Sequence, residues 1–200
     1  MKKIILSIFA LLAIFIITGC NSNKETKESN EVKSNNEVKN NEVKNSGNAV
    51  VVYFSATGTT KKIAERIAQF SNSDIIRIIP TEEYKSEDLD YNSDCRANRE
   101  QKDDKARPEI KNKIDISKYD TIYLGYPIWW ETNPKIILTL FDTYDFSGKT
   151  IVPFCTSGST DISGSVSDLR DYDSKLNIKD GKRFSASDSD ESIKEFINSK

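Results

Sequence analysis

Apolar segments that alternate with helical patterns constrain the fold of this chain more than any other feature. The first apolar run, Val50–Phe54, precedes a segment over 60–70 in which apolar residues recur at helical spacing. Further strands are predicted at 74–79, 121–124, 150–155 and 182–184, and further helices at 134–143, 165–176 and about 190–198. Mostly apolar strands that are followed by helices predict an α/β fold, with a parallel sheet and helices on both faces.

A polar loop joins the first strand to its helix, with the sequence Ser55-Ala56-Thr57-Gly58-Thr59-Thr60. The first N–H groups of a helix have no partner within it, and the helix dipole adds positive potential there. The loop is therefore a candidate anion site, in which Gly58 permits a tight turn. Hydroxyl donors for a phosphate are present on Ser55, Thr57, Thr59 and Thr60. Neither the P-loop motif nor G-x-G-x-x-G occurs. A phosphate held mainly by hydroxyls and backbone N–H groups suggests a monophosphate. The alternative is a loop that only caps its helix.

Two further loops leave the same edge of the predicted sheet, where ligands of such folds bind. The loop 125–133 contains both tryptophans of the chain, Trp129 and Trp130, which could stack on a flat conjugated ring. The alternative is that the tryptophans pack in the core. The loop 156–164 begins with Thr156, Ser157 and Gly158, whose backbone could lie close to the edge of such a ring.

The first residues are typical of an export signal. A positive start precedes the apolar stretch Ile4–Ile17, and the sequence Ile17-Thr18-Gly19-Cys20 resembles the lipobox of bacterial lipoproteins. The resemblance implies that 1–19 is a signal peptide and that Cys20 is lipidated, which would anchor the protein to a membrane. The alternatives are an ordinary signal peptide or an uncleaved anchor. The segment 20–48 is mostly Asn, Glu, Lys and Ser, so it is predicted to be a disordered tether before one domain at 49–200.

Composition excludes several functions. The chain contains no histidine, which excludes Ser-His and Cys-His catalysis and imidazole metal sites. Its net charge of −2 is unfavourable for nucleic-acid binding. Cys95 and Cys155 form no C-x-x-C motif, so no zinc or thioredoxin-type centre is indicated. We expect Cys155 to be buried and Cys95 to be exposed in a polar loop, without a disulfide between them. No metal site and no catalytic side chain is predicted.

Taken together, three stretches of the domain resemble flavodoxins. They are Val51-Val52-Tyr53-Phe54-Ser55-Ala56-Thr57-Gly58-Thr59-Thr60, Gly125-Tyr126-Pro127-Ile128-Trp129-Trp130 and Pro153-Phe154-Cys155-Thr156-Ser157-Gly158. The segment from Asp94 to Pro108 also resembles an insertion found in longer or lipoprotein-linked members. The likeness covers essentially all of 49–200.

The resemblance implies a doubly wound five-stranded sheet of order 2-1-3-4-5 that binds FMN. The loop Ser55–Thr60, with the N–H of Ala56, would hold the phosphate. Pro127, Ile128, Trp129 and Trp130 would flank the isoalloxazine, with Trp129 stacking on it, and Thr156, Ser157 and Gly158 would lie by its polar edge. Ser159-Thr160 stands where family members often have another glycine. Arg96 and Arg99 either fold over the flavin, meet a partner or carry solvated charge.

The function implied is electron transfer by an FMN protein tethered to the outer face of the cytoplasmic membrane. Its partners would be unidentified redox proteins, and a monomer is expected. The first alternative is an FMN-dependent NAD(P)H:quinone or substrate reductase, an oxidoreductase on the same fold. The second is a lipoprotein receptor or scaffold of the same shape that binds no flavin.

Overall fold

The structure is a computed structural model that describes residues 48–200. The predicted signal peptide, the lipidation site at Cys20 and nearly all of the predicted tether therefore lie outside the described residues. Within the described part, no helix combines the length and apolar character needed to cross a bilayer.

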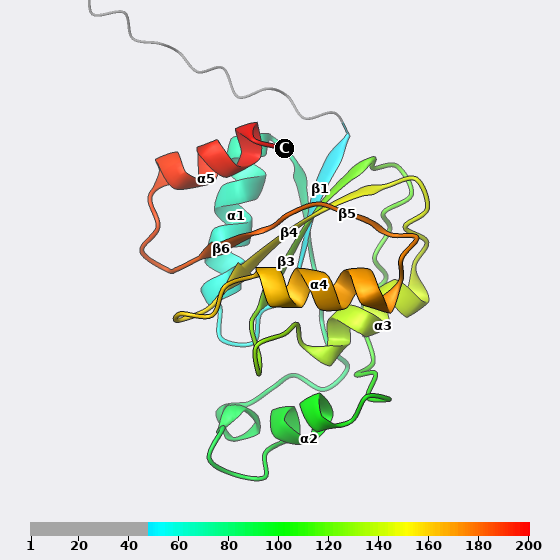
Figure 1. The fold of residues 1–200 in the computed structure, drawn as a ribbon, viewed down its shortest axis with the longest axis vertical. Helices are drawn as coiled ribbons and strands as arrows, with labels where there is room; N and C mark the ends of the chain where they lie inside the picture. Colours follow the sequence, from blue (N-terminus) through cyan, green and yellow to red (C-terminus); the bar gives the residue numbers. More distant parts are fainter. Residues whose placement is uncertain (1–47) are drawn as a thin grey trace, which may run out of the picture. The chain divides into compact units, whose positions relative to one another are not determined.

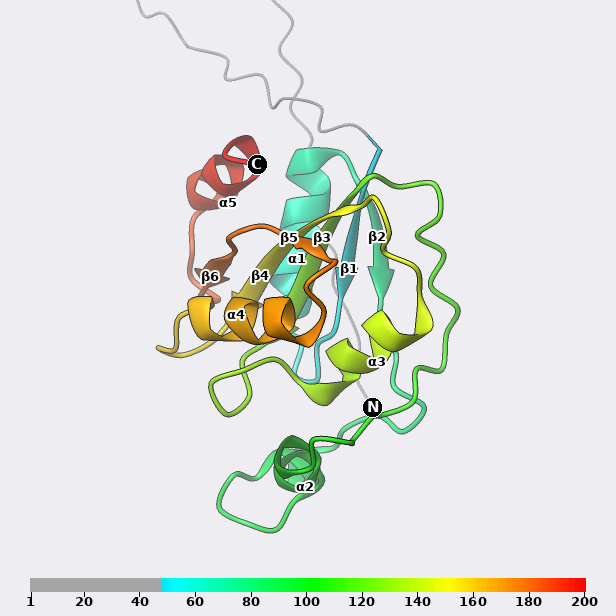
Figure 2. The same cartoon turned by 45° about the vertical axis from the view of Figure 1, so that its right-hand side comes forward.

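A parallel sheet in the order β2-β1-β3-β4-β5 forms the centre of the domain (Figures 1 and 2). Its strands are β1 (Ala49–Tyr53), β2 (Asp74–Arg77), β3 (Thr121–Pro127), β4 (Thr150–Thr156), β5 (Asn177–Ile178) and β6 (Lys182–Phe184). Each paired strand runs parallel to its neighbour. The predicted strand order and the doubly wound α/β class are confirmed.

The last position of the sheet is filled by two short segments rather than one. Both β5 and β6 pair with β4, and the register advances by one residue between Ile151↔Ile178 and Phe154↔Lys182. β5 and β6 are therefore two parts of one edge strand, interrupted near Gly181. A Cβ at Gly181 would lie 2.7 Å from the carbonyl oxygen of Pro153, so a side chain there would push the strands apart. The sequence predicted only the second segment, because β5 is two residues long and lies in a polar stretch.

Helices cover both faces of the sheet, as predicted. They are α1 (Thr59–Ser71), α3 (Lys135–Thr143), α4 (Ser163–Tyr172) and α5 (Asp190–Asn198). Alternate residues of a strand point to opposite faces, and here Val51 packs with α1 and α5 whereas Val50 and Val52 pack with α3 and α4. Each face thus has its own hydrophobic cluster, and the sheet is buried between them.

A long connection separates β2 from β3. It contains a 3-10 turn (Ser86–Leu89) and the short helix α2 (Arg96–Lys102), which lies apart from the two helical layers at the bottom of Figures 1 and 2. Its return segment runs beside the residues that follow β2, where the N–H of Lys111 donates to the carbonyl of Ile79 at 2.7 Å. The sequence did not predict α2, whose seven residues carry too few apolar positions for a helical pattern.

Some sequence predictions need correction, among them the end of β2 at Arg77 in place of 79 and the end of β3 at Pro127 in place of 124. Cys95 is buried, because it caps α2 and its Sγ accepts the N–H of Asn98 at 3.4 Å. Helix α4 ends at Tyr172 and not at Leu176, because Asp173 takes an extended backbone conformation. Cys155 is fully buried in β4 as expected, and both Cys95 and Cys155 are free thiols.

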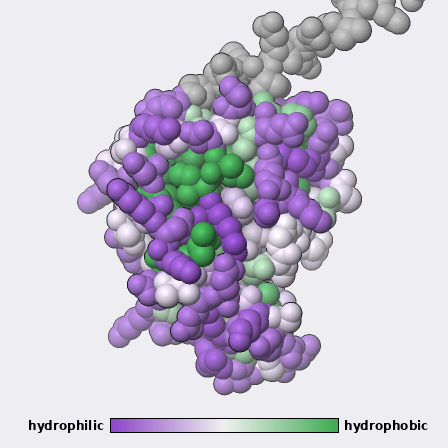
Figure 3. Space-filling model, turned by 180° about the vertical axis from the view of Figure 1, so that it is seen from behind, coloured by the Kyte–Doolittle hydropathy of each residue, from purple (hydrophilic) through white to green (hydrophobic). Residues whose placement is uncertain are grey.

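Within residues 48–200, only a few large hydrophobic side chains are exposed, namely Ile75, Tyr91, Trp130 and Tyr172. Seen from behind (Figure 3), hydrophobic side chains gather in a patch on the upper half of the domain, surrounded by hydrophilic ones. Tyr91 and Trp130 are in contact with one another, with ring centroids 4.7 Å apart. Their contact lies beside a cavity that Tyr91 helps to line.

Candidate functional site

A cavity of about 530 Å³ lies at the carboxyl ends of β1, β3, β4 and β6. Its lining residues are Thr57, Thr59, Leu89, Tyr91, Pro127, Ile128, Trp129, Thr156, Ser157, Gly158, Phe184, Ser185 and Ala186. All three loops singled out in the sequence meet here, and the volume is within the range of small-molecule sites. The structure therefore brings most of the predicted site residues together.

The first loop presents donors at the start of α1. Gly58 has a φ of 89°, and its N–H donates to Ser55 Oγ at 3.0 Å, which folds the loop back on itself. No protein acceptor within residues 48–200 takes the N–H groups of Thr57, Thr59 and Thr60. Unpartnered N–H groups at the start of a helix favour an anion. The loop thus has the donor set that a phosphate requires.

The four hydroxyls of this loop divide into two pairs. Thr57 is exposed and Thr59 half-buried, both line the cavity, and their oxygens lie 3.4 Å apart. Ser55 and Thr60 are buried beneath them. The Ser55 hydroxyl receives the N–H of Gly58, and the Thr60 hydroxyl is hydrogen-bonded to Thr156, so both stabilise the loop from within. That all four contact phosphate stays a prediction.

Trp129 forms an aromatic wall of the cavity and is also part of the core. Only 4% of its surface is exposed, and it packs edge-on against Phe54 and Tyr84 at centroid distances of 5.6 and 5.1 Å. Burial raises the pKa of Tyr84, as does the hydrogen bond that its hydroxyl donates to Glu100. The Tyr84 ring therefore stays neutral and supports Trp129 from behind. Trp130 does not line the cavity, and 38% of its surface is exposed.

The turn after Trp129 is strained. Trp130 and Glu131 both have positive φ, 48° and 66°, and two backbone hydrogen bonds join Trp129 to Thr132 around them. Positive φ angles at both central residues are characteristic of a type I′ turn, in which these two positions are normally Asn and Gly. A left-handed conformation costs a non-glycine residue on the order of 1–3 kcal/mol, so the surroundings must hold this turn in place.

The second and third loops are joined directly. The N–H of Ile128 donates to the carbonyl of Thr156 at 3.0 Å, which continues the pairing of β3 and β4 into the cavity wall. Ser157 is held from two sides, because its hydroxyl donates to the carbonyl of Thr160 and its own carbonyl accepts from Arg183 at 3.3 Å. A Cβ at Gly158 would have no neighbour within 4 Å, so this glycine faces open space.

Five lining residues were missed by the sequence analysis: Leu89, Tyr91, Phe184, Ser185 and Ala186. They come from the β2–β3 connection, from the end of β6 and from the segment after it, which carry no motif that marks them. Arg96 and Arg99 do not line the cavity. Arg96 pairs with Glu100 at 2.6 Å, while the mostly exposed Arg99 pairs with Asp94 at 3.5 Å.

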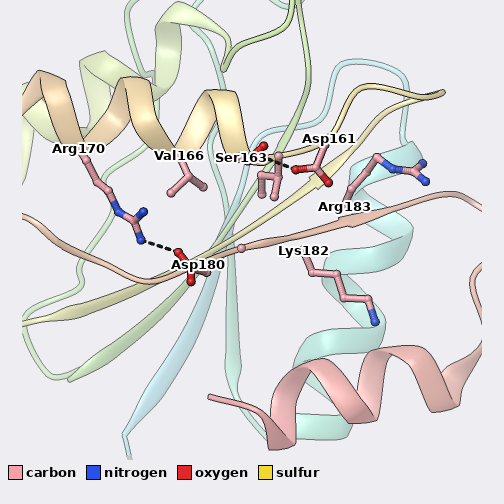
Figure 4. Close-up of a pocket in the computed structure, with 9 residues that line it drawn as sticks. Asp161, Ser163, Val166, Arg170, Asp180, Lys182 and Arg183 are labelled. Atoms are coloured by element: carbon pink, nitrogen blue, oxygen red, sulfur yellow. Dashed lines mark hydrogen bonds and ion pairs between the residues drawn. The ribbon is translucent and has the colours of Figure 1, made fainter.

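A second cavity, of about 370 Å³, lies between α4 and the edge strand (Figure 4). Its charged side chains are engaged within the protein. Arg170 points to Asp180 and pairs with it at 2.9 Å, and Asp161 accepts the N–H of Ser163 at 2.8 Å. Lys182 points toward α5, where it donates to the carbonyl of Ser192. Arg183 donates to the carbonyl of Ser157 at 3.3 Å, so each charged side chain that lines this cavity has a partner within the protein.

Comparison with known proteins relates the chain and its fold to one family. A family model of flavodoxins matches residues 48–200. A solved structure of a protein assigned as a flavoprotein in Bacteroides eggerthii is 38% identical, with a TM-score of 0.72, and the match covers 76% of this chain and 96% of that one. A counterpart from Bacteroides uniformis is also 38% identical, with a TM-score of 0.73 and coverages of 76% and 97%.

A third solved structure is a flavoprotein from Lactobacillus acidophilus in complex with FMN. It is 29% identical, with a TM-score of 0.58, and the match covers 68% of this chain and 91% of that one. No match was found among curated proteins.

Proposed function

Because the chain belongs to the flavodoxin family, we propose that it binds FMN in the 530 Å³ cavity and acts as an electron-transfer protein. The observation that carries this proposal is the pairing of two features in one cavity. Unpartnered N–H groups at the start of α1 lie on one side, and the indole of Trp129 lies on another. A phosphate joined to a flat ring system needs both.

The residues present fit FMN by their chemistry. The N–H groups of Thr57, Thr59 and Thr60 and the hydroxyls of Thr57 and Thr59 would hold the phosphate. Trp129 and Tyr91 would contact the ring system, and the backbone at Ser157 and Gly158 would lie near its polar atoms. FMN supplies the one- and two-electron redox chemistry, so the protein binds and orients it without a general acid or base.

Membrane attachment is the second part of the proposal. The lipobox-like sequence before Cys20 supports export and lipidation of that cysteine, and the polar segment 20–48 would serve as a tether. The redox domain would then work at the outer face of the cytoplasmic membrane, as a monomer that exchanges electrons with separate redox proteins. Globomycin, which blocks lipoprotein signal cleavage, should leave the precursor unprocessed in growing cells. Processing that is unaffected by the drug would contradict lipidation.

A flavin titration tests the cofactor. Purified protein is expected to quench the fluorescence of added FMN and to show a bound-flavin absorption spectrum. Riboflavin has the same ring system without the phosphate, so it should bind at least about tenfold more weakly if the α1 donors hold the phosphate. Equal affinity for both would contradict the phosphate site. A protein that neither quenches FMN nor is stabilised by it would exclude the flavin function altogether.

A second candidate function is an FMN-dependent NAD(P)H:quinone or substrate reductase. The exposed pair of Tyr91 and Trp130 favours it, because two aromatic rings beside the cavity offer a surface for a planar co-substrate. Steady-state oxidation of NADH or NADPH by the FMN-loaded protein, with and without a quinone, separates the two functions. Turnover supports the reductase, whereas reduction only by another redox protein supports the carrier.

A further inference from the structure

Helix α2 holds the aromatic side of the cavity although none of its residues lines the cavity. Gln101, near its C-terminal end, is half-buried and uses both ends of its amide. Its Nε2 donates to the carbonyl of Trp129 at 3.2 Å and to that of Asn133 at 3.3 Å, and its Oε1 accepts the N–H of Lys135 at 3.1 Å. One side chain thus contacts both ends of the strained turn and the first residue of α3.

The turn needs such external support. Trp130 and Glu131 lie between the two carbonyls that Gln101 binds, and both are in the left-handed region. Helix α3 has no side-chain cap of its own, because Pro134 stands at that position. The Oε1 of Gln101 takes one of the N–H groups that the first turn of α3 leaves unpartnered. Removing this amide would release the turn and the start of α3 together.

Helix α2 also fixes the ring of Trp129. Glu100 accepts hydrogen bonds from the Tyr84 hydroxyl and from Arg96, whose Nε lies 2.6 Å from the carboxylate. The Arg96 guanidinium lies 4.2 Å from the centroid of the Tyr84 ring, which packs edge-on against Trp129. The Trp129 ring is supported by Tyr84, which is bonded to Glu100 of α2, and the Trp129 backbone is bonded to Gln101 of α2. Helix α2 therefore fixes the position of both.

A further lining residue of the cavity, Tyr91, is tied to the same helix. Asn98 is buried, and its Nδ2 donates to the carbonyl of Tyr91 at 3.2 Å. Tyr91 lines the cavity, and its ring contacts that of Trp130 at a centroid distance of 4.7 Å. The relative position of the Tyr91 segment and the tryptophan turn is therefore set by α2.

We infer that Gln101 is a positioning residue for the cofactor site, which orders the turn 129–133 and thereby orients Trp129 toward the flavin. The inference rests on the proposed function, because the role concerns a bound flavin. The β2–β3 connection, which contains α2, would then preorganise the cofactor site. In the absence of the amide, only a fraction of the protein would hold the binding-competent turn, and the apparent Kd for FMN rises in inverse proportion to that fraction.

The test compares Gln101→Leu and Gln101→Glu with the control Lys102→Leu. Leucine removes all three hydrogen bonds, whereas glutamate keeps the acceptor for Lys135 and loses both donated bonds. Lys102 is exposed on the same helix and has no hydrogen bond to the turn. Three quantities are measured for each protein: hydrogen exchange of the Trp129 and Thr132 amides without flavin, the Kd for FMN, and the visible circular dichroism of bound FMN.

We expect faster exchange of both amides, about tenfold weaker FMN binding and an altered flavin dichroism for the Gln101 variants, with the control unchanged. If Gln101→Leu does not fold, the same three measurements on Gln101→Glu test the inference. Unchanged exchange, or unchanged affinity and dichroism despite faster exchange, would overturn the inference. If the wild-type protein did not bind FMN at all, the proposed function would fail, and the exchange data would still show whether Gln101 orders the turn.

Discussion

Thr60 and Thr156 lie 96 positions apart in the sequence and share a buried hydrogen bond of 2.7 Å between their hydroxyl oxygens. Thr60 is in the first turn of α1 and Thr156 is the last residue of β4. The bond therefore ties the loop that offers phosphate donors to the loop that begins with Ser157. It fixes two sides of the cavity relative to each other.

Replacing either threonine with valine should destabilise the protein by about 1–3 kcal/mol, because valine keeps the shape and leaves the partner hydroxyl buried without a hydrogen bond. The double variant Thr60→Val/Thr156→Val should lose less than the sum of the two single variants, since no unpaired hydroxyl remains. Urea unfolding of all four proteins gives the coupling energy. Strictly additive losses would mean that the two hydroxyls do not interact.

Gly125 permits the closest packing near the site. A Cβ at this position would lie 2.2 Å from Phe154 Cζ, and the Phe154 ring is fully buried and cannot move away easily. Gly125→Ala should therefore destabilise the protein by about 1–3 kcal/mol or more through overpacking. Thermal unfolding measures the loss. Gly164→Ala is the matched control, because its Cβ would meet only the Glu131 carbonyl at 3.7 Å and alanine favours the helix there. Similar effects of both substitutions would contradict the steric explanation.

The sheet was predictable because its central strands are buried on both faces and read as apolar runs. The cavity's position followed from topology, since the loops after β1, β3 and β4 must meet at one edge. The short elements were not predictable. Helix α2 depends on tertiary partners, namely the Cys95 cap and the Arg96–Glu100 pair, rather than on an apolar stripe.

The environment of the two tryptophans was also not predictable from the sequence. The sequence places both in one loop, but their burial depends on residues far away in the chain. Trp129 is covered by Tyr84 from the β2–β3 connection, whereas Trp130 is turned outward by its left-handed backbone. Neither the contact with Tyr84 nor the φ angle leaves a local signal. For the same reason Tyr91, which faces the cavity from that connection, could not be assigned beforehand.

Asp74 should contribute to the loss of stability in acid. The Tyr119 hydroxyl and the Lys118 ammonium both hydrogen-bond to its carboxylate and hold the pKa of Asp74 below its usual range. With a lower pKa in the folded state, its contribution is complete above about pH 4, the ordinary value for aspartate, and is lost as the pH falls through the folded-state pKa. Asp74→Asn should lower stability at pH 7 and reduce the further loss between pH 5 and pH 3.

The measurement is the urea midpoint of both proteins at pH 7, 5 and 3. Asp171→Asn is the control, because Asp171 is exposed on α4 and its side chain has no hydrogen-bond partner among residues 48–200. If Asp74→Asn and wild type lost stability in parallel across this range, titration of Asp74 would play no part.

Cys155 should be inert in the folded protein. Its side chain is fully buried, and burial raises the pKa of the thiol to about 12. At pH 8 only roughly one thiol in ten thousand would be ionised, and the thiolate is the reactive form. Iodoacetamide at pH 8 should label Cys155 only after urea unfolding, as peptide mass spectrometry would show. Rapid labelling of the native protein at this position would mean that β4 opens far more readily than its packing indicates.

The two threonines of the first loop that line the cavity, Thr57 and Thr59, should control FMN affinity. Thr57→Leu and Thr59→Leu each remove a hydroxyl that lines the cavity and place an apolar side chain beside the unpartnered N–H groups of α1. Losing one hydrogen bond to a charged group corresponds to about 1.5–3 kcal/mol, so each variant should bind FMN at least about tenfold more weakly. Riboflavin affinity should change much less, since it lacks the phosphate. Thr81→Leu, an exposed threonine outside the cavity, is the control. FMN and riboflavin fluorescence titrations of the four proteins decide the matter: equal losses for both flavins would place the ring system, and not the phosphate, beside this loop.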